Sequence, residues 1–257
     1  MKKRSFVLIT LIFVLCASIV LPTCAAEGTA QSFYIKKNGH NRPILPEDEK
    51  NIELYNAIYI DKNRADNDEE KILYLTFDAG YENGNVEKIL DVLKEENVPG
   101  AFFLLGHIIQ KNTNLIKRMQ AEGHLVCNHT VNHKDMTKCS KEEMKENLSR
   151  LEEIYAEYTG GTMEKIFRFP EGKYDEEHLL YAKELGYKTV FWSLAYADWD
   201  NNKQMLPEKA KRILLDNTHN GAVILLHPTS ATNAEILPAL IKEWRSMGYK
   251  FGSLSDL

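Results

Sequence analysis

Two histidines four positions apart are the feature of this sequence that points most directly to chemistry. His129 and His133, within residues 128–133, have the spacing that lets two imidazoles bind one metal ion. The same spacing also arises by chance on ordinary surface helices, so the pair by itself leaves both interpretations open. A metal ion held here would act together with acidic or basic groups supplied from other parts of the chain.

Four further residues could supply a base, an acid and the groups that orient them. They are Asp78, Arg168, Asp198 and His227. A carboxylate can take a proton from water, and an imidazole can give one to a leaving group. Each type also has an ordinary role, because aspartates cap turns, arginines pair with surface carboxylates and histidines bond within cores. The argument therefore depends on their joint arrangement.

The elements that would position these residues are short apolar runs that alternate with amphipathic segments. The runs predict strands at residues 72–77, 101–105, 125–127, 166–169, 189–192, 222–226 and 249–251. Apolar residues recur every three or four positions between them, as in residues 86–93 and 115–119, which predicts helices. Strands separated by helices need crossover connections. We therefore predict an α/β fold, a distorted (β/α) barrel of about seven parallel strands, with an open doubly wound sheet as the alternative.

In either parallel architecture, reactive residues belong at the carboxyl ends of strands. Five candidates follow or end a predicted strand: Asp78, His129, Arg168, Asp198 and His227. All of them therefore fall on one predicted face. One helix also has defined ends, because Ser140 and Glu143 form a capping-box signature and Gly160 is placed to end it.

The amino-terminal residues have the order of a secretory signal peptide. Three basic residues precede an apolar run at 6–21, and Pro22 and small residues follow up to Ala26. We expect cleavage after Ala26 and export to the cell wall or the outer face of the cytoplasmic membrane, with the spore cortex space as one such location. A retained membrane anchor and lipidation of Cys24 are the alternatives. Residues 27–70 are polar and are expected to wrap the catalytic domain at 71–257.

Composition narrows the range of partners. The chain has 257 residues, 44% of them hydrophobic, enough for one domain with a full core. The net charge of −5 argues against a nucleic-acid binder, and loss of the basic signal makes the remainder more acidic. We expect a monomer. Cys127 and Cys139 remain after export, and either a disulfide or two free thiols is compatible with the sequence.

The motifs around the candidate residues resemble those of the polysaccharide deacetylases, carbohydrate esterase family 4. The matching stretches keep the family's order and spacing and lie at residues 76–80, 129–133, 168–172, 198–199 and 225–227. Residues 76–84 and 191–193 look closest to the delta-lactam-biosynthetic de-N-acetylases. That subgroup acts on N-acetylmuramic acid in the peptidoglycan of the spore cortex.

The resemblance implies a role for each matched residue in amide hydrolysis. Asp78 resembles the general base, which Arg168 would hold ionised, and His227 resembles the general acid. Asp198 would raise the pKa of His227. His129 and His133 resemble ligands of a divalent metal such as zinc. Glu171 would donate its backbone amide to the oxyanion, and Trp199 and Leu225 would contact the substrate. A buried core tryptophan is the alternative for Trp199.

The sequence departs from the family pattern at Ala79, where the usual motif has a second aspartate that completes the metal site. Ala79 supplies no ligand, so metal binding is expected to be weak or completed differently. Glu82 and Asn83 are candidates for a substitute ligand, with turn or substrate-facing roles as the alternative.

The resemblance implies a peptidoglycan N-acetylmuramic acid de-N-acetylase that contributes to muramic delta-lactam formation in sporulation. One alternative is a deacetylase of N-acetylglucosamine in peptidoglycan or chitin-like chains. Another, of a different class, is a catalytically dead module that binds the cell wall. The presence of Asp78, Arg168, Asp198 and His227 argues against a dead module, because a binding module needs neither a base nor an acid.

Overall fold

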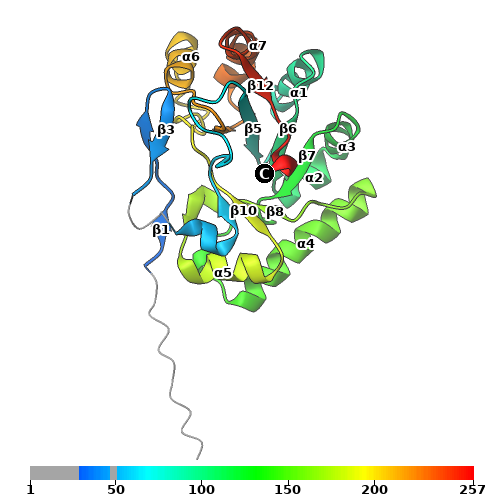
Figure 1. The fold of residues 1–257 in the computed structure, drawn as a ribbon. Helices are drawn as coiled ribbons and strands as arrows, with labels where there is room; N and C mark the ends of the chain where they lie inside the picture. The colour runs from blue at the N-terminus through cyan, green and yellow to red at the C-terminus, as the bar shows by residue number, and fades with distance from the viewer. Residues whose placement is uncertain (1–28, 47–50) are drawn as a thin grey trace, which may run out of the picture.

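The computed structural model describes residues 29–46 and 51–257. The predicted signal peptide at 1–26 lies outside the described residues. One curled, parallel sheet forms the centre, in the strand order β11-β5-β6-β7-β8-β10-β4, and β12 pairs with β5 (Figure 1). Its strands are β4 (Ala57–Ile58), β5 (Lys71–Ala79), β6 (Gly100–Leu104), β7 (Leu125–Asn128), β8 (Ile166–Phe167), β10 (Lys188–Val190), β11 (Val223–Leu226) and β12 (Tyr249–Phe251).

The curl of the sheet brings its two ends together just beyond β10. Leu194 forms a parallel bridge with Ile224 of β11, and the Leu225 amide donates to the Leu194 carbonyl at 2.9 Å. A second isolated bridge, antiparallel, links Ile60 after β4 with Ala222 before β11. Isolated bridges thus join the two ends where a regular barrel would have a full strand pair. The fold is therefore the predicted distorted (β/α) barrel, and the open doubly wound alternative is wrong.

Helices surround the sheet on its outer side (Figure 1). They are α1 (Asn85–Glu95), α2 (Gly106–Lys111), α3 (Thr113–Ala121), α4 (Lys141–Thr159), α5 (Glu176–Glu184), α6 (Pro207–Asp216) and α7 (Ala231–Ser246), with short 3-10 helices at Ile52–Tyr55, Met136–Lys138, Pro170–Gly172 and Leu254–Asp256. Helix α4 has the predicted capping box at Ser140 and ends at Gly160, whose φ of 75° suits glycine.

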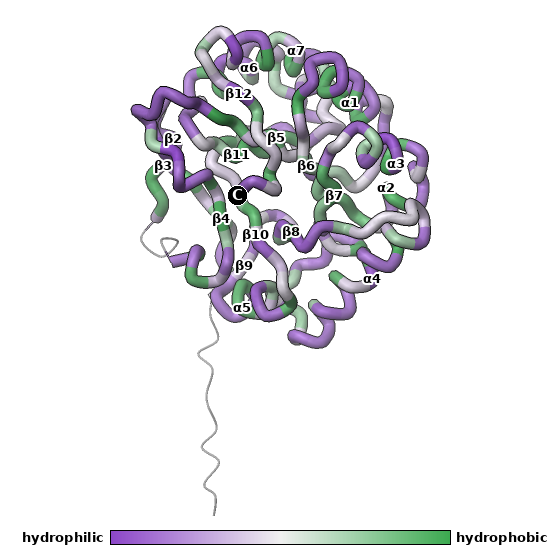
Figure 2. The backbone as a smooth tube through the Cα atoms, turned by 45° about the vertical axis from the view of Figure 1, so that its right-hand side comes forward, coloured by the Kyte–Doolittle hydropathy of each residue, from purple (hydrophilic) through white to green (hydrophobic). Residues whose placement is uncertain are grey.

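The alternation of side chains along β5 separates the core into two layers. Leu73, Leu75 and Phe77 point outward and pack in the cluster that the helices cover, whereas Tyr74 points into the barrel. The interior cluster also contains Phe103, Cys127, Val190 and Leu254. Figure 2 shows the apolar residues concentrated along these strands and the hydrophilic ones on the outside. Polar residues further along β5 therefore emerge at the carboxyl end of a packed interior.

The described part of the extension packs on the barrel and adds strands to it. Strand β1 (Gln31–Ser32) pairs with β9 (Lys173–Tyr174), β2 (Lys36–Asn38) pairs with β3 (Asn41–Ile44), and β4 joins the main sheet beside β10. The sequence did not predict β4, because two residues are too few to show a pattern. The domain boundary near residue 70 stays a prediction.

Two other expectations are answered by the structure. Strand β8 is shorter than predicted, because Phe169 leads into the 3-10 helix that starts at Pro170. Cys127 and Cys139 are both buried and free, so the disulfide alternative is wrong for this structure. Within residues 29–46 and 51–257, no helix is both long enough and apolar enough to cross a membrane.

Candidate active site

The register of the sheet places the candidate residues at one level. Ala79 is level with Leu104, Leu104 with Asn128, and Asn128 with Phe167. His129 and Arg168 are the residues that follow Asn128 and Phe167, so they emerge side by side above the packed interior. On the other side of β5, Leu226 pairs with Phe77, which brings His227 beside Asp78. The predicted convergence of these residues on one face is confirmed.

Arg168 is fully buried and fixes the carboxylate of Asp78. Its guanidinium donates to Asp78 Oδ1 at 2.7 Å and to Thr76 Oγ1 at 3.0 Å. It also donates to the carbonyls of Val190 and Phe191 at 2.8 and 3.0 Å. Burial alone would raise the pKa of Asp78, but the charge and hydrogen bond of Arg168, together with the nearby His129 and His227, outweigh it and the pKa is lowered. Asp78 is therefore ionised, as a general base must be.

His129 is held in the tautomer that leaves one nitrogen lone pair free. Its Nδ1 donates to the Arg168 carbonyl at 2.9 Å, so Nε2 carries no proton and lies 3.7 Å from Asp78 Oδ2. Burial lowers the pKa of His129 to about 4, although the Asp78 charge opposes this effect. The ring is therefore neutral at physiological pH and able to bind a cation.

His133 approaches His129 through a loop and not along a helix. The two ring centroids are 5.1 Å apart, and both Thr130 and His133 have positive φ, at 74° and 60°. The His133 amide donates to Thr130 Oγ1 at 2.9 Å, which stabilises the turn. Non-glycine residues adopt such angles at an energetic cost. Strained residues of this kind are common at functional sites, where the backbone must orient a side chain. The chance surface-helix interpretation is therefore wrong.

Asp198 orients His227 on the opposite side of the site. Its Oδ1 accepts from His227 Nδ1 at 2.7 Å, and its Oδ2 accepts from the His227 amide at 2.8 Å. Burial alone would lower the pKa of His227, but the hydrogen bond to Asp198 and the charges of Asp198 and Asp78 outweigh it and raise the pKa. His227 can therefore carry a proton at higher pH than an ordinary histidine.

Asn233 is a positioning residue that sequence reasoning missed. It is fully buried in α7, and its Nδ2 donates to Asp198 Oδ2 at 2.6 Å and to the His227 carbonyl at 3.0 Å. Tyr196 donates in turn to Asn233 Oδ1 at 2.5 Å. No local motif marks an asparagine in a helix for this role, because the contacts depend on how α7 packs beside β11.

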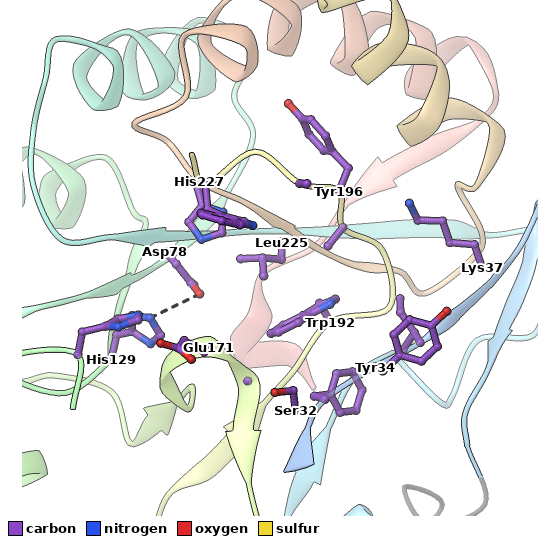
Figure 3. A pocket seen from close by; sticks show the side chains of 17 residues that line it. Ser32, Tyr34, Lys37, Asp78, His129, Glu171, Trp192, Tyr196, Leu225 and His227 are labelled. Atoms are coloured by element: carbon purple, nitrogen blue, oxygen red, sulfur yellow. Dashed lines mark ion pairs between the residues drawn. The ribbon is translucent and has the colours of Figure 1, made fainter. Parts of the chain in front are cut away.

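All the candidate residues except Arg168 and Asp198, which lie behind Asp78 and His227, line one pocket of about 880 Å³ (Figure 3). Asp78, His129, His133 and His227 face it together with Glu171, Trp199 and Leu225. Trp199 is 67% exposed, so the core interpretation of this residue is wrong. Trp192 and Tyr196 also line the pocket, and the extension contributes residues between Ser32 and Lys37. Glu171 has a left-handed φ of 57°, in the sharp turn that carries it into the pocket.

Ala79 and its neighbours do not face this pocket. Ala79 packs in the outer apolar cluster, on the side of β5 opposite Asp78. Asn83 donates to the Thr229 carbonyl at 2.9 Å, and the Glu82 carboxylate accepts from the Gly84 amide. Neither side chain lines the pocket, so neither is placed as a substitute ligand. The effect of a carboxylate at position 79 stays a prediction.

The two imidazoles fit a divalent cation as two of its ligands. They lie close together, and His129 presents a lone pair beside a carboxylate oxygen. No group of three or more histidine, cysteine, aspartate or glutamate side chains that could hold a metal occurs in the part of the chain that the structure describes. A cation here would therefore depend on water or substrate to complete its coordination.

The chemistry that this arrangement allows is the hydrolysis of an unreactive carbonyl compound. A carboxylate with a lowered pKa and an imidazole with a raised pKa lie on neighbouring strands at the pocket, which is the pairing that general acid–base catalysis needs. Each of the two is held by a buried partner, Arg168 or Asp198, so the pair keeps its geometry without substrate.

Comparisons with known proteins agree with this interpretation. The family description "polysaccharide deacetylase" matches residues 65–190. The chain is 38% identical to the peptidoglycan-N-acetylmuramic acid deacetylase PdaA of Bacillus subtilis, over 94% of this chain and 93% of the relative. The solved structure of PdaA, a family 4 carbohydrate esterase, superposes with a TM-score of 0.83 over 89% of this chain and 97% of that one. A peptidoglycan-N-acetylglucosamine deacetylase of Bacillus cereus is 33% identical over 71% of this chain and 66% of the relative.

Proposed function

The chain belongs to the polysaccharide deacetylase family, and from this premise we propose that it removes the acetyl group of N-acetylmuramic acid in peptidoglycan. As a family member it is a hydrolase of carbon–nitrogen bonds other than peptide bonds. The observation that carries the proposal is the opposed pair at the pocket, Asp78 with a lowered pKa and His227 with a raised one. The likeness to PdaA over nearly the whole of both chains supports muramic acid as the sugar.

In the proposed reaction, Asp78 takes a proton from a water molecule while the water oxygen bonds to the acetyl carbon. Arg168 keeps Asp78 ionised before this step and oriented during it. The negative charge that develops on the carbonyl oxygen is stabilised by the backbone amide of Glu171. His227 then gives its proton to the sugar nitrogen, the carbon–nitrogen bond breaks, and acetate and a free amine are released.

His129 and His133 are the residues that would hold a divalent cation in this site. When bound, such a cation supplies a positive charge that polarises the acetyl carbonyl. We infer weak binding, because two imidazoles lack the third protein ligand that structural and catalytic zinc sites use. The cation is zinc or a similar ion.

Export to the cell wall is part of the same proposal, because peptidoglycan lies outside the cytoplasmic membrane. The signal-like residues 1–26 support this location, either as a cleaved signal or as a retained anchor. A contribution to muramic delta-lactam in the spore cortex is the finer proposal, and it rests on the resemblance of residues 76–84 and 191–193 to that subgroup.

Product analysis tests the proposal. Purified protein is incubated with peptide-free glycan strands of peptidoglycan, and the sugars are identified by mass spectrometry. Free muramic amine or muramic lactam is the expected product. Glucosamine alone would favour the activity named for the Bacillus cereus relative and contradict our choice. Parallel samples with chelator, and with chelator followed by zinc, show whether a cation is needed.

A further inference from the structure

The amino-terminal segment forms a wall of the pocket opposite His129 and His227 (Figure 3). Ser32, Tyr34 and Lys37 line the same cavity as Asp78 and His227 (Figure 3). The segment is fixed to the barrel, because the Phe33 amide donates to the Gly172 carbonyl at 2.8 Å. The Phe33 ring also stacks on Phe191, with centroids 4.3 Å apart. This wall is thus held beside the turn that carries Glu171.

The hairpin that carries Lys37 is tethered to the barrel as well. Its two strands, β2 and β3, are joined by a hydrogen bond of 3.1 Å from Asn38 Nδ2 to the Arg42 carbonyl. Arg42 Nη2 donates to the Asp61 carbonyl at 3.1 Å, and His40 Nδ1 lies 3.0 Å from the Thr218 carbonyl. The position of Lys37 at the pocket rim is therefore set by the fold and does not depend on bound substrate.

Lys37 brings to the pocket a positive charge with no ion-pair partner among the described residues, whereas Asp78 and Glu171 in the same pocket are paired. The Asp78 carboxylate is bonded to Arg168, and Glu171 is paired with Lys173 at 2.6 Å. The Lys37 side chain makes no hydrogen bond or ion pair with any residue in the described ranges 29–46 and 51–257. Its side chain reaches toward the cavity in Figure 3. An ammonium in this position can take an anionic group of the substrate.

Muramic acid differs from glucosamine by a lactyl ether on the third carbon of the ring, which ends in a carboxylate. That carboxylate lies next to the acetamido group on the second carbon, so it enters the pocket with the reacting bond. We propose that Lys37 is a specificity-determining residue that binds the free lactyl carboxylate of the substrate. This inference rests on the proposed function and adds the group that distinguishes its substrate from glucosamine.

The test compares two neighbouring lysines. Lys36 lies in the same strand, is exposed and does not line the pocket, so Lys36→Gln is the matched control for Lys37→Gln. Steady-state kinetics use a peptide-free oligosaccharide of N-acetylglucosamine and N-acetylmuramic acid with free lactyl carboxylates. A second substrate has the same carboxylates converted to neutral carboxamides. Wild-type product analysis on the first substrate tests the proposed function separately.

Lys37→Gln should raise KM for the free carboxylate substrate by roughly 5- to 50-fold. This range lies between the contribution of a surface ion pair and that of a hydrogen bond between charged groups. The value of kcat should change little, because in this proposal Lys37 contacts the lactyl carboxylate and neither the acetyl group nor the attacking water. On the carboxamide substrate, Lys37→Gln and wild type should have the same KM. Lys37→Arg should restore most of the loss, since the positive charge returns, and added salt should shrink the difference.

Equal KM values for Lys37→Gln, Lys36→Gln and wild type on the free carboxylate substrate would overturn the inference while leaving the proposed function intact. An equal loss on the carboxamide substrate would also overturn it, because the lysine would then act without regard to the carboxylate. If wild-type protein releases acetate only from N-acetylglucosamine, the proposed function itself fails. The three results are distinguishable in one set of assays.

Discussion

The buried base of the pocket, here called the floor, and its solvent-exposed edge, the rim, differ in burial and in hydrogen bonding. Arg168, beneath the floor, is fully buried, and its donors are bonded to Asp78, Thr76 and two backbone carbonyls. At the rim, Tyr34 is 63% exposed and Trp199 is 67% exposed. Groups on the floor keep their positions without substrate, whereas rim side chains lie in water until a glycan covers them. Chemistry and substrate choice are therefore expected to respond to different substitutions.

Replacement of the buried Arg168 guanidinium should have the largest effect, because it lowers both the stability of the fold and the activity. Arg168→Met leaves Asp78 as an unpaired buried charge, so we expect a loss of roughly 3–5 kcal/mol in the free energy of unfolding. The matched control is Arg150→Met, because Arg150 forms an exposed ion pair with Glu153. That pair should contribute under about 1 kcal/mol. Equal urea denaturation curves for the two variants would contradict the role of Arg168 beneath the floor.

Loss of either catalytic group should remove activity and leave the fold intact. Asp78→Asn and His227→Ala are each expected to lower kcat by roughly 10²–10⁴, the usual contribution of a positioned base or acid. Acetate release measures the rate, and circular dichroism checks that each variant is folded. Turnover close to that of wild type in either variant would remove its assigned role.

Asn233 should have a smaller effect, because it acts through Asp198 and His227 and not on substrate. Asn233→Ala removes two hydrogen bonds that hold this pair, and we expect kcat to fall about tenfold with little change in KM. The split between kcat and KM is the informative readout. A change in KM alone would show that Asn233 shapes the pocket and does not orient the acid.

A rim substitution should have the smallest effect and change binding alone. Trp199→Ala removes an exposed aromatic surface from the pocket, and we expect KM to rise about three- to tenfold with kcat preserved. Leu206→Ala is the control, because Leu206 is 75% exposed and does not line the pocket. If kcat falls by as much as it does in the floor variants, the distinction between floor and rim fails.

The sequence predicted the barrel and the floor because both depend on local patterns. The apolar runs located the longer strands, and the strand ends then located Asp78, His129 and Arg168, since parallel strands deliver their carboxyl ends to one edge. The capping box of α4 was equally visible, because a helix cap is set by residues three positions apart.

The parts that were missed depend on contacts between distant segments. Asn233 reaches Asp198 only through the packing of α7, and Thr76 supports Arg168 from another strand of the sheet. Lys37 reaches the pocket because β1 pairs with β9, more than a hundred residues away. His133 approaches His129 because Thr130 and His133 have left-handed backbone conformations in a loop. A hydrophobic pattern does not indicate such conformations.

The pH profile of kcat/KM tests most directly the claim that Asp78 is the base and His227 the acid, because this ratio reports the free enzyme. Asp78 must be ionised and its pKa is lowered, so activity should begin to fall only below the ordinary aspartate value of 3.8. His227 must be protonated and its pKa is raised, so the loss at high pH should lie above the ordinary histidine value of 6.5. In Asp198→Asn the high-pH limb should move to lower pH, because the hydrogen bond and charge of Asp198 are what raise that pKa. A wild-type limb at or below pH 6.5 that stays in place in Asp198→Asn would contradict the account.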